Sequence, residues 1–293
     1  MTAASVSAAT EAGLLTPAER GAIQWLSTDI RVTSDVRRAV ETSNPEVVFH
    51  LAGLSYVPDA REAPELAYDV NVLGAVRLLT ELNRHRLDSA VDPVVLVVGS
   101  ATQYGKHDVA EMPLVEDAVQ RPADVYGASK AAQEIVALQF FRANGMRVIC
   151  TRSFNHSGLG HAAHFLLPAL VRRVLALRGE SRPALRLGNQ DSVRDYLHVA
   201  DVVEAYLLLV ERGMPGEVYN VCSGDGVSVR ELAADVLLRA GVIADITTDA
   251  ALVRGVDVPA LVGSPAKLRQ ATGWRPTHTR TDIIDDLLHA PTY

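Results

Sequence analysis

The sequence has few cysteines and no excess of basic residues. Only Cys150 and Cys222 occur among the 293 residues, and each lies in an apolar stretch. This pattern favours buried free thiols over a disulfide or a metal pair, and it fits a reducing cytoplasm. The formal net charge of −7 argues against a protein that binds nucleic acid or a membrane surface, because both uses need a broad basic field.

Long hydrophobic runs are also missing. No stretch approaches the roughly 20 apolar residues that span a bilayer, and residues 1–9 lack both the basic residues and the apolar segment of a signal peptide. We therefore expect a cytoplasmic protein without a membrane partner. With 48% apolar residues, the chain can bury one large core, or a large and a small lobe.

Short apolar runs alternate with helical stretches in the first half of the chain. The runs 46–52, 93–100 and 147–152 have the continuous apolar character of strands that are buried on both faces. Residues 64–84 and 126–144 predict the helices between them. Strands separated by helices of this length predict a parallel sheet covered on both faces, so the expected fold class is α/β, doubly wound.

The alternation weakens after Arg152, which indicates a second, smaller lobe. We expect a Rossmann-like core of residues 1–154 plus about 195–222, and a ligand-binding lobe of about 155–194 and 223–293. A ligand cleft is expected outside the carboxyl ends of the strands.

Tyr126 and Lys130 lie one turn apart on a predicted helix, and Ser100 ends a predicted strand. A phenol with a pKa of about 10 is a poor base at neutral pH, but a neighbouring ammonium group would lower that pKa. A lone Tyr-x-x-x-Lys pattern is common by chance. The upstream serine, together with Asn71, makes it specific, and we predict a catalytic acid–base set of Ser100, Tyr126 and Lys130.

These residues and several other segments resemble the extended short-chain dehydrogenase/reductase family, and most of all its GDP-mannose 4,6-dehydratases and GDP-4-keto-6-deoxymannose reductases. The matching segments are Asp29–Ile30, Phe49–Gly53, Asn71–Gly74, Val98–Ser100, Tyr104–Gly105, Tyr126–Lys130, Arg152–His156, Leu187–Asn189, Arg194–Asp195, His198–Asp201, Tyr219–Asn220 and Gly273–Pro276. The resemblance covers nearly everything from residue 22 onwards. It implies an enzyme with a Rossmann-like fold whose smaller lobe binds a nucleotide sugar, with a GDP-hexose as the best match.

The resemblance also implies which residues bind the GDP-sugar. They are Thr102, Asn155, Leu187, Asn189, Arg194, Arg254 and Asp257. The amide of Asn155 and the guanidinium groups of Arg194 and Arg254 suit a diphosphate, and Asp257 could accept hydrogen bonds from ribose hydroxyls. The alternative is that each arginine forms an internal ion pair with a nearby aspartate.

The sequence departs from the family pattern before residue 22. No Val/Ile/Phe-type strand and no Gly-x-x-Gly-x-x-Gly loop occurs there, although such a loop normally holds the dinucleotide pyrophosphate at a helix N-terminus. Thr16 and Pro17 predict a helix start instead. Asp29 and Ile30, which would touch adenine in the family, remain as vestiges. We therefore expect an N-terminally truncated Rossmann-like domain with no tightly bound NAD or NADP.

A second departure is Thr102, which stands where the dehydratases have a glutamate base, so dehydration is disfavoured. Nearby, His156, His161 and His164 could bring a divalent cation such as Mg²⁺ or Mn²⁺ to the diphosphate. A solvated loop with a structural His156 is the simpler interpretation, and the metal ligands stay unknown.

Three functions follow from these observations. The leading hypothesis is a GDP-hexose isomerase that works without hydride transfer, such as a pyranose/furanose mutase. The first alternative is an NAD(P)-dependent GDP-4-keto-6-deoxyhexose reductase or epimerase, with a misassigned start codon or a cofactor loop supplied elsewhere. The second is a catalytically silent nucleotide-sugar-binding protein, against which the complete acid–base set argues. A homodimer formed through the helices bearing Asn71 and Tyr126 is also expected.

Overall fold

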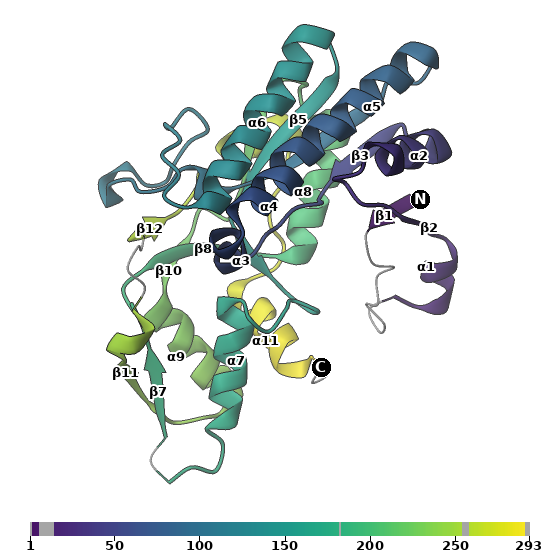
Figure 1. The fold of residues 1–293 in the computed structure, drawn as a ribbon. Coiled ribbons are helices and arrows are strands. Elements are labelled where there is room, and N and C mark those ends of the chain that lie inside the picture. The colour runs from purple at the N-terminus through teal and green to yellow at the C-terminus, as the bar shows by residue number, and fades with distance from the viewer. Residues whose placement is uncertain (1, 6–14, 182, 254–257, 291–293) are drawn as a thin grey trace. The chain divides into compact units, whose positions relative to one another are not determined.

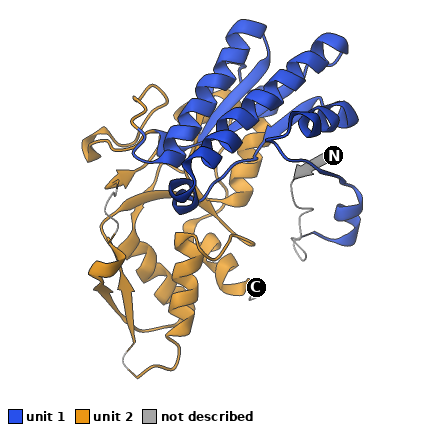
Figure 2. Ribbon diagram, in the orientation of Figure 1, with its two compact units in different colours: residues 1–103, 122–152, 209–218 blue, residues 104–121, 153–208, 219–293 orange. Residues whose placement is uncertain are grey.

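The computed structural model describes residues 2–5, 15–181, 183–253 and 258–290 (Figure 1). The chain forms two compact units (Figure 2). Unit 1 comprises residues 1–103, 122–152 and 209–218, and unit 2 comprises residues 104–121, 153–208 and 219–293. The chain therefore passes between the units several times. The domain boundaries expected from the sequence remain a prediction.

Unit 1 is built from strands that alternate with helices. Its elements are β1 (Thr2–Ser5), α1 (Pro17–Gly21), β2 (Gln24–Ser27), α2 (Thr33–Ser43), β3 (Val47–His50), α3 (Val57–Glu62), α4 (Pro64–Tyr68), α5 (Gly74–Asp88), β4 (Val94–Ser100), α6 (Val125–Asn144) and β5 (Arg147–Ser153). β3 and β4 are parallel, with Val47 opposite Val94. The main sheet has the order β3-β4-β5-β9, where β9 is Val218–Val221. The α/β class with a parallel sheet is confirmed.

One face of this sheet is covered by helices. α5 and α6 pack against each other, and α2 packs on α5 (Figure 1). The buried apolar residues between these helices and the sheet are Val40, Leu79, Leu82, Val95, Val97, Ala137, Met146, Val148 and Cys150. The strand at 46–52 was expected to be buried on both faces, but Val47 and Phe49 are 41% and 37% exposed. The reason is that β3 ends the sheet in the described part of the chain.

The N-terminal region also differs from expectation. The sequence predicts no strand before residue 22, yet Thr2–Ser5 forms β1 and pairs in parallel with β2, with Thr2 opposite Gln24. The predicted helix start is confirmed, because Thr16 caps α1 in a reciprocal arrangement with Glu19.

Two features of the unit 1 helices bear on the candidate site described below: the ends of α6 and an irregular segment between α4 and α5. α6 begins where the Asp124 side chain accepts a hydrogen bond from the Gly127 amide at 2.7 Å, and it ends at Gly145, whose φ of 66° lies in the left-handed region. The predicted helix 64–84 is α4 and α5 joined by a π-helical segment, Asp69–Leu73. Asn71 lies buried in that segment, and such segments are frequent at functional sites.

Unit 2 has its own core of helices packed on short strands. Its elements are β6 (Asn155–Ser157), α7 (Leu166–Ala176), β7 (Ala184–Leu187), β8 (Val193–His198), β10 (Gly226–Ser228), α9 (Val229–Ala240), β11 (Asp245–Thr248), β12 (Ala260–Leu261), α10 (Ala266–Thr272) and α11 (Arg280–His289). Helix α8 (Val199–Arg212) has residues in both units. β8 pairs with β10, β12 and β6, and β7 pairs with β11. Helices α7, α9 and α11 surround the apolar core.

Both cysteines are buried and unbridged, as expected. Burial raises the pKa of each thiol, so neither is a reactive thiolate. In the parts of the chain that the structure describes, no helix is long and apolar enough to cross a bilayer.

Candidate active site

Ser100, Thr102 and Tyr126 meet at the carboxyl end of β4. The Tyr126 hydroxyl is hydrogen-bonded to the Ser100 side chain. The Ser100 Oγ also accepts a hydrogen bond from the Thr102 Oγ1 at 2.9 Å and one from the Thr102 amide at 3.3 Å. Thr102 therefore holds the serine hydroxyl that faces the phenol.

Lys130 lies one turn further along α6 and is buried. Its Nζ donates to the Val98 carbonyl oxygen and to the Gln133 Oε1, each at 2.7 Å. Burial lowers the pKa of Lys130 to about 8. Burial raises the pKa of Tyr126, the Asp124 carboxylate adds to this, and the Ser100 hydrogen bond opposes it. The expectation that the ammonium brings the phenol pKa down is therefore wrong for this arrangement.

Asn71 fixes the segment that follows β3. Its Oδ1 accepts from the Leu54 amide at 2.7 Å, and its Nδ2 donates to the Ser129 Oγ at 2.8 Å. A Cβ on Gly53 would lie only 3.0 Å from the Asn71 Oδ1 and 3.5 Å from the Lys130 Nζ. Glycine at this position therefore leaves bare backbone beside the ammonium group.

A series of buried hydrogen bonds holds the backbone of Ser100 in place. The Ser100 amide donates to the Gln103 Oε1 at 2.7 Å, and the Gln103 Nε2 donates to Glu134 at 2.8 Å. Glu134 also binds Arg152 of β5 through two hydrogen bonds of 2.9 and 2.7 Å. Sequence reasoning did not find Gln103 and Glu134. Their positions in the sequence could have indicated them, because Gln103 comes three residues after Ser100 and Glu134 comes four residues after Lys130.

Unit 2 contains the described residues that the resemblance assigns to the GDP-sugar, apart from Thr102. Asn155 lies opposite Tyr196 in the β6–β8 pair, and their side chains are hydrogen-bonded. The Arg194 guanidinium donates to the Val193 carbonyl oxygen at 2.8 Å. The side chain of Leu187 is buried in the core of this unit. Arg254 and Asp257 lie outside the described residues.

Asn189 lines a cavity of about 220 Å³ in unit 2, where its Oδ1 accepts from the Asp191 amide at 3.1 Å. The lining residues are Gly188, Asn189, Gln190, Asp191, Arg230, Thr248 and Val253. Gln190 donates to Thr248 at 2.8 Å, while its buried Oε1 has no partner in the described part of the chain. The lining of this cavity includes polar side chains, among them the guanidinium group of Arg230, that suit a polar ligand. Gln190 and Arg230 were not predicted.

The three histidines after Asn155 have partners other than a metal. His156 Nδ1 lies 2.9 Å from the Phe154 carbonyl oxygen, and His161 Nδ1 lies 2.8 Å from the Ser157 Oγ. The rings of His161 and His164 each lie 4.5 Å from the ring of Phe165. Over the described ranges, no cluster of three potential metal ligands is found.

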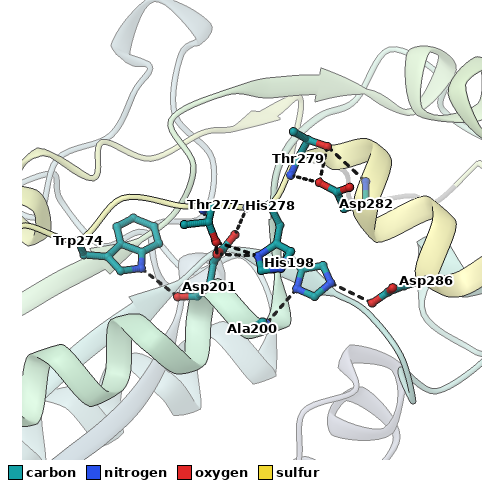
Figure 3. A network of polar contacts seen from close by, with 9 residues as sticks. All are labelled: His198, Ala200, Asp201, Trp274, Thr277, His278, Thr279, Asp282 and Asp286. Atoms are coloured by element: carbon teal, nitrogen blue, oxygen red, sulfur yellow. Dashed lines mark hydrogen bonds and ion pairs between the residues drawn. The ribbon is translucent and has the colours of Figure 1, made fainter.

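A polar network in unit 2 joins two segments that resemble the family, around His198 and Gly273 (Figure 3). Buried Asp201 accepts hydrogen bonds from the Thr277 side chain and from the Thr277 and His278 amides. Its backbone oxygen accepts from the Trp274 indole at 3.0 Å. The rings of His198 and His278 are stacked, with centroids 4.2 Å apart. This network ties the start of α8 to the segment before α11.

A parallel α/β sheet with serine at a strand end and Tyr-x-x-x-Lys on the next helix defines a short-chain dehydrogenase/reductase. The sequence model of the family described as GDP-mannose 4,6 dehydratase matches residues 4–287. The chain belongs to this family of extended short-chain dehydrogenases/reductases, and it is an enzyme of that class.

Two curated relatives narrow the comparison. The chain is similar to the GDP-6-deoxy-D-mannose reductase of Pseudomonas aeruginosa, with 36% identity over 236 residues, covering 80% of this chain and 76% of the relative. It is also similar to the UDP-glucose 4-epimerase of Streptomyces lividans, with 32% identity over 251 residues, covering 82% of this chain and 73% of the relative.

Two solved structures share the fold. The structure of RMD from Pseudomonas aeruginosa complexed with NADPH matches with a TM-score of 0.82 and 32% identity, over 94% of this chain and 91% of that one. The UDP-glucose 4-epimerase of Thermus thermophilus in complex with NAD matches with a TM-score of 0.83 and 26% identity, over 99% of this chain and 91% of that one.

These comparisons correct two expectations. The leading hypothesis of a GDP-hexose isomerase without hydride transfer is wrong, because the relatives are a reductase and epimerases, and the NAD(P)-dependent alternative fits better. The expectation of no tightly bound NAD(P) is also wrong, because the similar structures hold NADPH and NAD. It depended on the absence of a glycine-rich motif from residues 1–21, of which 1 and 6–14 lie outside the described residues.

The reactive end of a nicotinamide cofactor fits the residues in unit 1. His50 at the end of β3 is 3% exposed, and its Nε2 has no partner in the described part of the chain. Burial, together with the charge of Lys130, lowers the pKa of His50 to about 3, so the ring is neutral. An unpaired buried nitrogen and the bare backbone at Gly53 are features that a polar ligand would satisfy.

Proposed function

We propose that the protein is an NAD(P)-dependent oxidoreductase that reduces the 4-keto group of a GDP-4-keto-6-deoxyhexose. The observation that carries the proposal is the contact of Tyr126 with Ser100, next to Thr102 in place of an acid. A carbonyl reductase needs a proton donor there and has no use for the base of a dehydratase. The similarity to GDP-6-deoxy-D-mannose reductase supports the choice of substrate.

When bound, a reduced nicotinamide supplies hydride to the C4 carbonyl carbon. Tyr126 donates its phenol proton to the carbonyl oxygen, which becomes the hydroxyl of a secondary alcohol. The pKa of Tyr126 lies above its ordinary value, so the phenol is protonated at neutral pH, as an acid must be. Ser100 hydrogen-bonds the same oxygen, and the phenolate then takes a proton from solvent.

Other residues of this chain would hold the two ligands. Lys130 and the backbone at Gly53 would hold the nicotinamide end of the cofactor. Asp29 follows β2 and is bound by Arg31 through hydrogen bonds of 2.6 to 3.1 Å. The sequence suggested that Asp29 is only a vestige of a cofactor site. We assign Asp29 and Arg31 instead to the adenosine end of the bound cofactor.

The nucleotide of the sugar substrate would bind to unit 2. Asn155 and Arg194 would bind the diphosphate, because amide and guanidinium donors suit phosphate oxygens. The cavity beside Asn189 would take part of the nucleoside. Arg254 and Asp257 keep the roles that the resemblance implies, and a homodimer stays a prediction.

The test is turnover of GDP-4-keto-6-deoxymannose with NADPH or NADH, followed by nicotinamide absorbance. Tyr126→Phe should lower kcat about 10²- to 10⁴-fold, because the acid is removed, and should leave GDP affinity unchanged. UDP-glucose is the comparison substrate. No turnover of the keto sugar with either cofactor would refute the proposal, and epimerisation of UDP-glucose alone would favour a 4-epimerase.

A further inference from the structure

Gln133 is a buried glutamine on α6, three residues after Lys130. It is 0% exposed, and its Oε1 accepts a hydrogen bond from the Lys130 Nζ at 2.7 Å. Its Nε2 has no hydrogen-bond partner in the part of the chain that the structure describes. A buried amide with an unpaired NH₂ group is costly, and an apolar residue would fill this place without that cost. We therefore expect the amide oxygen of Gln133 to have a function that an apolar side chain could not perform.

The ammonium group that Gln133 contacts is held by neutral oxygens. The Nζ donates to the Val98 carbonyl and to Gln133. The carboxylate of Glu134, the next residue on α6, is bonded to Arg152 and Gln103. Because both partners are neutral, the loss of either one would make it more costly for the buried Lys130 side chain to carry its charge.

The other titratable groups around Lys130 do not replace these partners. His50, at the end of β3, is neutral. Tyr126, on the same helix, is bonded to Ser100 and is protonated at neutral pH. The carboxylate of Asp124, which precedes the helix, caps α6 through the Gly127 amide.

We propose that Gln133 is a positioning residue for Lys130: its amide oxygen fixes the ammonium group at the end of β4, beside Gly53, and keeps it charged. The catalytic consequence rests on the proposed function, but the positioning itself does not. In the proposed reductase, a charged Lys130 would orient the cofactor beside the phenol that supplies the proton.

Two substitutions of similar size separate this role from simple packing. Gln133→Leu removes one acceptor and should lower the Lys130 pKa from about 8, and Gln133→Glu supplies a carboxylate and should raise it. A shift of about one unit or more is expected in each direction. A residue that only fills space would not move the Lys130 pKa in opposite directions.

The pKa can be read directly, because the sequence has only three lysines, Lys106, Lys130 and Lys267. Protein with ¹³C-labelled lysine therefore gives three side-chain signals. Lys106→Arg and Lys267→Arg assign two of them and leave Lys130 as the third. The titration uses the full chain without substrate, so it does not depend on activity. The matched control is Gln139→Leu, which changes an exposed glutamine on the same helix.

The alkaline limb of the kcat/KM profile should follow the same order, lowest in Gln133→Leu and highest in Gln133→Glu. If Gln133→Leu does not fold, Gln133→Glu decides alone: a Lys130 signal that titrates as in the wild type overturns the proposal. Opposite NMR shifts in a protein without reductase activity would support the positioning role and would refute the proposed function.

Discussion

At the scale of single residues, Glu134 connects the fold to the candidate site. It binds Arg152 on one side and, through Gln103, the backbone of Ser100 on the other. Both members of the ion pair are buried, with side-chain exposures of 6% for Arg152 and 4% for Glu134. A buried charge that loses its partner costs much more than the intact pair contributes.

Arg152→Met should therefore lower the free energy of unfolding by about 3 to 5 kcal/mol, because it leaves Glu134 charged, buried and without its cation. Urea unfolding followed by circular dichroism measures this loss. The double variant Arg152→Met with Glu134→Leu should recover a large part of it, because both charges are gone. A single variant as stable as the wild type would contradict this account.

At the scale of elements, the stacked histidines join the end of β8 to the segment before α11 (Figure 3). The Ala200 amide donates to the His198 Nδ1 at 3.1 Å, so His198 carries its proton on Nε2, which lies 3.0 Å from Asp286. The hydrogen bond to Asp201 raises the pKa of His278. Burial opposes ionisation of Asp201, but the hydrogen bonds from His278 and Thr277 hold its pKa below the ordinary value.

These directions set the pH range in which the Asp201–His278 pair stabilises the fold. The raised His278 pKa gives stability that is complete below about pH 6.5 and is lost as pH rises through the folded value. The lowered Asp201 pKa gives stability that is present above about pH 3.9 and is lost as pH falls through the folded value. The pair therefore stabilises most between these limits.

His278→Gln should consequently lower the urea midpoint more at about pH 5.5 than at about pH 8.5. The His278 side chain is 39% exposed, so the effect is modest. His289→Gln, on an exposed residue of α11, is the control for the exchange of a histidine for a glutamine. An equal loss at both pH values would show that His278 acts through packing alone.

The long elements could be predicted from the sequence, and the short ones could not. The helix predicted at 126–144 is α6, Val125–Asn144, because the residues that begin and end it, Asp124 and Gly145, act locally. Strands such as β6 and β12, of three and two residues, depend on pairing with the distant β8, which no local pattern encodes. The π-helical segment that holds Asn71 was not predicted either, and the contacts of Asn71 with Leu54 and the distant Ser129 are likewise not encoded in a local pattern.

The same contrast holds for the site. The contact between Ser100 and Tyr126 follows from a strand end and a helix start, which the sequence marks clearly. The direction in which the Lys130 side chain points could not be predicted from the sequence. Its partners Val98 and Gln133 depend on how α6 packs on β4. The inferences about Gln133 and His50 depend on the burial of both side chains, which the sequence does not show residue by residue.

At the scale of the whole molecule, the mistaken hypothesis came from giving one missing motif more weight than a complete acid–base set. A glycine-rich loop supplies pyrophosphate contacts, whereas the residues that handle the proton lie elsewhere in the chain. The similar structures with NADPH and NAD show that this fold is used with nicotinamide cofactors. The raised pKa of Tyr126 then suits an acid that protonates a carbonyl.

The proposed assignment of the two ligands to the two units can be tested by hydrogen exchange. The proposed nicotinamide contacts lie in unit 1 and the proposed nucleotide contacts lie mainly in unit 2. NADPH should therefore slow exchange in peptides covering 50–54, 98–103 and 126–133. GDP should slow exchange in peptides covering 154–157 and 187–194, because bound ligand stabilises the segments that contact it.

Arg194→Met provides the control, because it should reduce the protection by GDP and leave the protection by NADPH unchanged. The reason is that a neutral thioether cannot pair with the diphosphate, whereas the unit 1 residues are unaltered. Protection of 98–103 and 126–133 by GDP, with none in 154–157 or 187–194, would mean that the nucleotide occupies the place assigned to the cofactor. The roles of Asn155 and Arg194 would then have to be abandoned.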